Sequence, residues 1–240
     1  MWCAPNDEVI EAQKRVCTGP KQSRPLTVER DSPDPKRILD LILKTVSGEI
    51  LPCQAVSYSQ IGAYLAAMCI RRTFDDSCNW SPAEENAFAA VSNLLKKLPP
   101  GLKFLLDGKG KPDCSHDEMA VVEALRIVLV GRHLDYAQTK SALSGILSGQ
   151  VRPEWSAALL IGQRMNIEND EEVSAYLDVV LPVETVWQLN IPSITHLGSP
   201  FDGSLRYFRP NIFIAAVRAA LGRPTVLHGV DLMPPKNRWN

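Results

Sequence analysis

Glycines, an aspartate and a histidine follow two short apolar runs near the end of the chain. Residues 194–197 lead into a Gly-Ser-Pro-Phe-Asp-Gly turn at 198–203, and residues 225–227 lead into a His-Gly pair at 228–229. Glycine allows backbone angles that other residues resist, and N–H groups exposed in such a turn suit an anion such as phosphate. Asp202 could accept hydrogen bonds from a ligand hydroxyl or help to hold a metal. The histidine could donate to a phosphate or stack against a ring.

The segment between the two runs has the spacing of a helix. Apolar residues recur from Asn211 to Leu221, and Gly222 ends the pattern. Strand, glycine-containing loop, helix and strand together predict one β-α-β crossover. In open α/β sheets, ligands bind outside the carboxyl ends of the strands, which would bring both turns to one site. An ordinary strand-to-helix turn with a capping aspartate stays open as the alternative, because short glycine motifs also occur by chance.

These motifs resemble the phosphoribosyl-diphosphate site of anthranilate phosphoribosyltransferases. That family has a Gly-Thr-Gly-Gly-Asp-Gly loop, Asn-Ile-Ser-Thr at the start of a helix, and Lys-His-Gly-Asn after the next strand. The chain matches at 198–203, poorly at 209–212, and at 227–230. The loop and the His-Gly-x-Asp-x-Met-Pro-x-Lys run at 228–236 resemble a divergent cyanobacterial and plant branch more closely. The substrate-binding positions that the resemblance implies are Gly198, Ser199, Asp202, Gly203, Asn211, His228 and Gly229.

The chain departs from the family at several of these positions. Leu227 replaces the family's lysine before His-Gly, and Phe201 replaces the third loop glycine. Asn211 and Ile212 stand where the family has a phosphate-binding Ser-Thr pair. The resemblance implies Mg²⁺ as the cofactor of the family. The family's acidic Mg²⁺-binding motif has no counterpart before Asn240, so we expect the chain to be truncated at its C-terminus and to lack the Mg²⁺ ligands. No catalytic residue and no metal ligand is assigned.

Two functions follow from these observations. The resemblance implies transfer of phosphoribose from phosphoribosyl diphosphate to an aromatic amine, and we expect this chain to be inactive because it lacks most of the catalytic domain. The alternative is a non-catalytic relative that dimerises or binds nucleic acid. Four arginines within 18 residues, interleaved with Tyr207 and Phe208, leave a phosphate or single-strand nucleic-acid surface open beside a merely solvated helix flank. They are Arg206, Arg209, Arg218 and Arg223. A phosphate ligand and a second copy of the chain are therefore the expected partners, with nucleic acid as a third.

Bulk composition indicates a soluble intracellular protein. The 240 residues carry a formal net charge of −1, which gives no general argument for nucleic acid or an anionic membrane. No run of 18 apolar residues and no secretory signal is present, so no membrane partner is expected, and cytoplasm and plastid are not resolved. The six cysteines form no Cys-x-x-Cys pair, and the four histidines show no metal-binding spacing.

Helical periodicity with recognisable start and stop signals fills most of the chain before residue 190. Asp34, Ser57, Ser81 and Asp135 are expected helix caps, and helices are expected at 35–47, 57–72, 81–98, 117–130, 136–147, 153–165 and 170–181. Residues 43–50 parallel 146–151, and residues 58–65 parallel 154–160, which suggests a degenerate internal duplication.

These patterns predict an α+β chain that is mostly α. The expected divisions are a flexible leader at 1–33, in which 9–16 could form one short helix, a helical block at 34–100, a linker at 101–114, a helical domain resembling the family's N-terminal domain at 115–190, and an incomplete phosphoribosyl-diphosphate-binding α/β domain at 191–240. The helical regions should leave apolar surface exposed, and such surface usually marks an interface, so a homodimer is expected.

Overall fold

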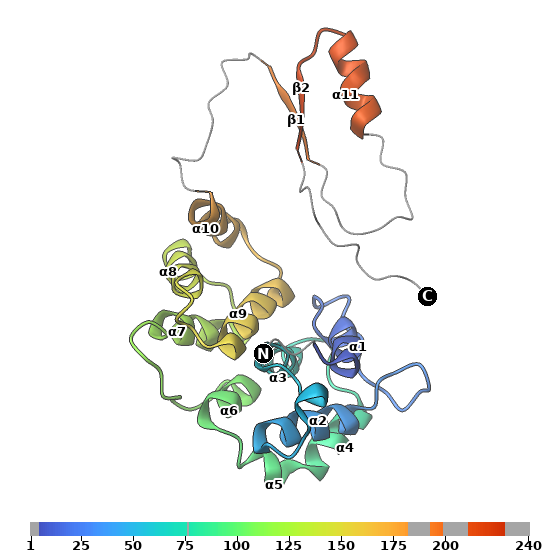
Figure 1. Cartoon of the computed structure of the whole chain (residues 1–240), viewed down its shortest axis with the longest axis vertical. Coiled ribbons are helices and arrows are strands. Elements are labelled where there is room, and N and C mark those ends of the chain that lie inside the picture. Colours follow the sequence, from blue (N-terminus) through green and yellow to red (C-terminus); the bar gives the residue numbers. More distant parts are fainter. Residues whose placement is uncertain (1–4, 76, 182–192, 199–210, 229–240) are drawn as a thin grey trace. The chain divides into compact units, whose positions relative to one another are not determined.

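The computed structural model of the chain describes residues 5–75, 77–181, 193–198 and 211–228. The chain divides into two compact units, unit 1 at Met1–Thr185 and unit 2 at Val186–Asn240, and each is described by itself (Figure 1). All the regular secondary structure in the described part of unit 1 is helical, and the described part of unit 2 contains a two-stranded parallel sheet with one helix. The predicted class, α+β and mostly α, is confirmed.

Unit 1 contains ten α-helices and one short 3₁₀-helix among its described residues. They are α1 (Asp7–Val16), α2 (Pro35–Ser47), η1 (Pro52–Gln54), α3 (Tyr58–Arg71), α4 (Pro82–Ala90), α5 (Ser92–Leu95), α6 (Pro100–Asp107), α7 (Met119–Val128), α8 (Tyr136–Leu147), α9 (Pro153–Asn166) and α10 (Asp170–Val180). Unit 2 contains β1 (Thr195–Gly198), α11 (Asn211–Ala220) and β2 (Thr225–His228). In the described part of the chain, no helix combines the length and apolar character needed to cross a bilayer.

Side-chain caps determine where many of these helices begin. The predicted caps Asp34, Ser57, Ser81 and Asp135 all accept a hydrogen bond from a backbone N–H of the first turn. At Ser57, Ser81 and Asp135 the side chain of the third helical residue accepts a hydrogen bond from the backbone N–H of the cap, which completes a capping box. These local signals are strong because a helix start leaves several N–H groups without a partner.

The core of unit 1 is built around α3. Every residue from Gln60 to Arg71 is buried, and α3 packs on α1, α6 and α9 (Figure 1). At the crossing with α9, Gly62 lies so close to the backbone of Glu154 that a Cβ atom on Gly62 would sit 2.0 Å from the Glu154 carbonyl oxygen. Trp155, on the first turn of α9, is fully buried. The two helices thus meet backbone to backbone, which only glycine permits.

In the segment expected as a flexible leader, 1–33, the short helix allowed at 9–16 is present as α1, and its apolar side packs into the core. Val9, Ala12 and Val16 of α1 are fully buried, and Leu26 is also fully buried. The apolar residues lie three and four positions apart, so they form one face of a helix despite the polar composition of the segment. The start of α1 is held by α3, because the Asn6 N–H donates to Gln60 Oε1 at 3.0 Å and Gln60 Nε2 donates to the Asn6 carbonyl at 2.9 Å.

The expected linker at 101–114 and the separation of two helical regions are corrected by the structure. Most of the first half of that segment is α6, in which Leu102, Phe104, Leu105 and Leu106 are buried, and only 108–114 lacks helix. Helices from both predicted blocks share one core through the α3–α9 contact, so they form a single unit. The expected helix at 81–98 is divided into α4 and α5 at Val91.

Candidate functional site

The carboxyl ends of β1 and β2 lie side by side, as the β-α-β prediction requires. The strands are parallel, with Thr195 opposite Thr225, Leu197 opposite Leu227 and Gly198 opposite His228 (Figure 1). The glycine that opens the first turn therefore neighbours the histidine that opens the second, although 30 positions separate them in the chain. The predicted convergence of the two strand ends is confirmed for these two residues.

Arg218 fixes the direction of α11 relative to the strands. From the last turn of the helix, its Nε donates to Thr225 Oγ1 at 3.2 Å, and its Nη2 donates to Thr195 Oγ1. Thr195 and Thr225 are the first residues of their strands, so the C-terminal end of α11 lies at the amino edge of the sheet. The helix therefore runs from the carboxyl edge toward the amino edge, and its first residue, Asn211, is at the end directed toward Gly198 and His228. Arg218 itself has a structural role away from that edge.

The remaining predicted residues lie outside the described part of the chain. Gly198 and His228 end β1 and β2, and Asn211 begins α11. Ser199, Asp202, Gly203 and Gly229 fall in residues that the structure does not describe. Three of the seven predicted substrate-binding positions are thus described, and two of them, Gly198 and His228, pair at the carboxyl edge of the sheet.

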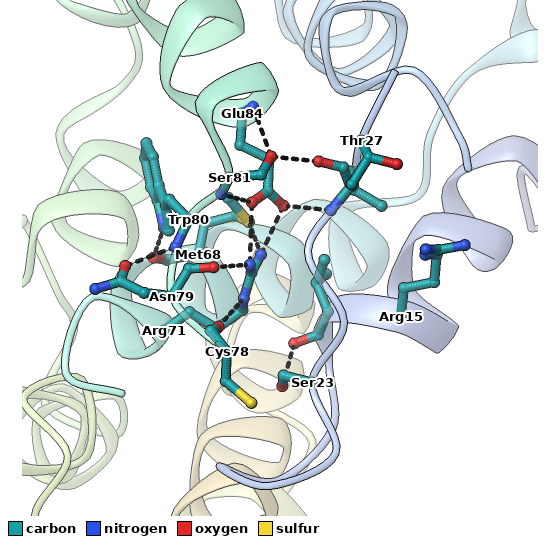
Figure 2. Close-up of polar contacts among 12 residues, drawn as sticks. Arg15, Ser23, Thr27, Met68, Arg71, Cys78, Asn79, Trp80, Ser81 and Glu84 are labelled. Carbon is teal, nitrogen blue, oxygen red and sulfur yellow. Dashed lines mark hydrogen bonds and ion pairs between the residues drawn. The ribbon is translucent and has the colours of Figure 1, made fainter. Parts of the chain in front are cut away.

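Unit 1 holds a buried ion pair that sequence reasoning missed. Arg71 and Glu84 are both fully buried, and Arg71 Nη1 lies 2.6 Å from Glu84 Oε1 (Figure 2). Arg71 also donates to the carbonyls of Cys78 and Asn79. Adjacent arginines at the end of a helix, such as Arg71 and Arg72, usually face solvent, so the sequence did not indicate that Arg71 is buried. It indicated only that Glu84 occupies a capping-box position.

All the hydrogen-bonding capacity of this pair is used within the fold. Glu84 Oε1 accepts from Arg71 and from the Leu26 N–H at 3.0 Å, and Oε2 accepts from Arg71 at 3.0 Å and from the Ser81 N–H at 2.8 Å. A buried charge is tolerable only when it is paired and hydrogen-bonded, and here both partners are. The pair ties the chain before α2 to α3 and α4, and it leaves no lone pair or proton for a substrate.

A second buried carboxylate, Glu172, is held in a similar way. Its Oε1 accepts from the Leu134 N–H at 3.1 Å and Gln163 Nε2 at 3.2 Å, and its Oε2 lies 3.0 Å from both the Asn169 N–H and His133 Nδ1. Burial raises the pKa of Glu172, but the hydrogen bonds from Asn169, Leu134, Gln163 and His133 together lower it overall. Both carboxylate oxygens are thus already engaged within the fold.

A metal cluster and a reactive thiol are two further kinds of site that the described residues could form. No three His, Cys, Asp or Glu side chains among these residues come together to hold a metal ion. Burial raises the pKa of Cys17 to about 12 and that of Cys69 to about 11, which disfavours the nucleophilic thiolate. The carboxyl edge of the sheet in unit 2 is therefore the candidate site that the described geometry favours.

Comparison with known proteins shows which family the chain resembles. Residues 122–181 match the helical bundle domain of the glycosyl transferase family. The chain is 33% identical over 109 residues to an anthranilate phosphoribosyltransferase of Thermomicrobium roseum, covering 44% of this chain and 30% of that protein. It is 27% identical over 116 residues to an anthranilate phosphoribosyltransferase of Dictyoglomus turgidum, covering 48% of this chain and 34% of that protein.

The matched segments span about a third of the length of these curated relatives. No solved structure matches the chain. The resemblance to anthranilate phosphoribosyltransferases that the motifs predicted is confirmed.

Proposed function

We propose that the chain, whose residues 122–181 match the helical bundle domain of the glycosyl transferase family, is an anthranilate phosphoribosyltransferase-like protein that binds phosphoribosyl diphosphate in unit 2. The observation that carries the proposal is the pairing of Gly198 with His228 at the carboxyl edge of a parallel sheet. This edge is where ligands bind in open α/β sheets. The two curated relatives are named for this activity, and its assignment to this chain is part of the proposal.

The groups at this edge suit a diphosphate. The start of α11 is directed toward it, and the first turn of a helix carries the positive end of the helix dipole, which favours an anion. His228 supplies an imidazole that can donate to a phosphate oxygen, and Gly198 lets the backbone approach the ligand closely. Charge-assisted hydrogen bonds of this kind are stronger than neutral ones, so a multiply charged diphosphate is the preferred ligand class.

The reaction of the family type breaks the bond between the sugar C1 and the diphosphate oxygen and forms a bond from C1 to an amine nitrogen, which then loses a proton. We propose that this chain binds the phosphoribosyl diphosphate without this turnover. Leu227 occupies the position before His228 where the resemblance expects a lysine, so the leaving diphosphate meets one cation fewer. We include Mg²⁺ as a cofactor only because the resemblance implies it, and we assign it no step of the reaction.

The binding test is calorimetric titration of the full chain with phosphoribosyl diphosphate, with and without Mg²⁺. We expect His228→Ala to weaken binding about tenfold, since one charge-assisted hydrogen bond is worth roughly 1.5–3 kcal/mol. His116→Ala is the matched control, because His116 is an exposed histidine of unit 1 and should leave the affinity unchanged. Equal affinities for all three proteins would remove the site from the carboxyl edge.

The activity test is loss of anthranilate fluorescence with phosphoribosyl diphosphate and Mg²⁺. We expect no turnover above the protein-free rate. Turnover that disappears in His228→Ala would overturn the inactivity and show that the chain assembles a working site. Binding to single-stranded nucleic acid that falls steeply with salt, without any effect of phosphoribosyl diphosphate on thermal stability, would instead favour the non-catalytic alternative.

A further inference from the structure

A hollow with four lysines around it lies in unit 1, beside α6. Its volume is about 400 Å³, and it is lined by Lys96, Lys103, Lys109 and Lys111 together with Asp107. Leu98 and Pro100 contribute apolar lining. We call it the basic hollow. A volume of this size falls within the range of about 300–1,000 Å³ found for small-molecule sites.

Local structure explains why these lysines converge. Lys103 and Asp107 are four residues apart on α6, so they lie on the same side of the helix. Gly108 ends the helix with a left-handed backbone angle, φ +67°, after which Lys109 and Lys111 follow in the non-helical segment. Lys96 precedes α6, after the short helix α5. Residues that precede α6 in the sequence and residues that follow it thus line the same hollow.

The positive charge of the basic hollow is not neutralised within the fold. None of its four lysines forms an ion pair with any described residue, whereas Lys14 and Lys36 pair with acids on their own helices. Asp107 is the one acid among the lining residues, and its Oδ1 accepts the backbone N–H of Lys109 at 2.8 Å. Four lysines against one aspartate give a formal charge of +3, in a chain whose net charge is −1.

The dimensions of the hollow make these charges act together. A sphere of 400 Å³ is about 9 Å across, which is close to the Debye length of about 8–10 Å at 0.10–0.15 M salt. Charges lining a concave surface of one sign also focus the field and concentrate counter-ions there. Mutual repulsion of the four ammonium groups is relieved when one multiply charged anion occupies the space between them.

We propose that the basic hollow binds a compact oligophosphate anion, of the class of inorganic diphosphate or triphosphate. Lysine ammonium groups are mobile point charges that suit phosphate oxygens without demanding planar geometry. No aromatic ring lines the hollow, so the stacking that retains single-stranded nucleic acid is missing there. All the residues that line this hollow belong to unit 1.

The test is calorimetric titration of the full chain with inorganic triphosphate at 50 mM salt. The double substitution Lys103→Gln with Lys111→Gln should weaken binding about tenfold or more, since it removes two charge-assisted contacts. The control, Lys21→Gln with Lys140→Gln, changes the net charge equally at exposed lysines outside the hollow. The control should bind as the unaltered chain does, and circular dichroism should show all three proteins folded.

Three results would overturn the proposal. The first is no heat of triphosphate binding at 50 mM salt, and the second is an equal loss in both double variants, which would show that only bulk charge matters. The third is tighter binding of oligothymidylate than of triphosphate with the same dependence on Lys103 and Lys111, which would assign the hollow to a nucleic-acid backbone. His228→Ala should leave triphosphate binding to the hollow intact, so failure here and failure of the unit 2 site are distinguished.

Discussion

Buried carboxylates in unit 1 stabilise the fold by collecting N–H donors. Glu118 is the most strongly perturbed of them, with a side chain only 6% exposed. Its bond with Arg152 Nε, at 2.7 Å, is the largest contribution that lowers the pKa of Glu118 to about 2, and the Ser115 N–H adds to it. The guanidinium of Arg152 in turn stacks 3.6 Å from the ring centre of Trp155. The pair therefore joins the start of α7 to the start of α9.

We predict that Glu118→Gln destabilises the chain at neutral pH by about 2 kcal/mol. The pKa shift from 4.5 to about 2 corresponds to about 3 kcal/mol, and the 40% exposure of Arg152 reduces this through solvent screening. Because the folded pKa is lowered, the stabilisation is complete above pH 4.5 and is lost as the pH falls toward 2. The measurement is urea unfolding of both proteins at pH 7, 4.5 and 3.

Glu123→Gln is the control for this pH dependence, since Glu123 is 66% exposed and its ion pair with Arg126 should contribute little. The destabilisation by Glu118→Gln should shrink steadily from pH 4.5 to 3. A difference that stays constant over this range would mean that packing, and not the charge of Glu118, holds the two helices together.

At the scale of elements, the two halves of unit 1 use the same device. Glu84 is the third residue of α4 and accepts the N–H of Leu26, which precedes α2. Glu172 is the third residue of α10 and accepts the N–H of Leu134, which precedes α8. Both carboxylates are buried and both belong to capping boxes. This correspondence agrees with the internal duplication suggested by the sequence, in which α3 and α9 are equivalent and pack on each other.

Elements with local signals could be predicted, whereas burial that depends on distant contacts could not. Asp34 and Asp135 indicate helix starts because their own side chains cap the helices. Two short apolar runs separated by a segment of helical periodicity were enough to predict the β-α-β unit. The burial of α1 depends on α3, through contacts such as Asn6 with Gln60 across 54 positions, and α6 is buried by the same helix. At the candidate site the pairing of the strand ends was predictable, because parallel connections follow topology.

We predict that Gly62→Ala disrupts the α3–α9 contact. The added Cβ would lie 2.0 Å from the Glu154 carbonyl oxygen and 2.6 Å from its Cα, so two helix backbones must separate. Overpacking usually costs 1–3 kcal/mol, and a backbone clash should reach at least about 3 kcal/mol. For a chain of this size we expect the Tm to fall by about 6–12 °C in a thermal melt. Gly19→Ala, whose Cβ would make an ordinary 3.7 Å contact, should melt within about 2 °C of the unaltered chain.

At the scale of the whole molecule, the units differ in how much apolar surface they bury. Unit 1 has a continuous core, whereas no residue at 193–197 or 211–227, where the exposure of unit 2 is described, is buried. On α11, Phe213 is 61%, Ile214 41% and Val217 60% exposed, and their spacing places them on one side of the helix. Two strands and one helix bury little apolar surface. We therefore expect that association of chains through this side of α11 would stabilise unit 2.

We therefore predict that the chain self-associates through α11. Light scattering after size-exclusion chromatography, across about 1–100 µM protein, should show a mass above that of one chain that rises with concentration. Ile214→Ser with Val217→Ser should lower this mass, because the pair removes apolar area from the contact. Leu51→Ser with Leu147→Ser, at positions 65% and 62% exposed in unit 1, should leave it unchanged. A monodisperse monomer at every concentration, or an equal decrease in both double variants, would show that α11 is not the contact.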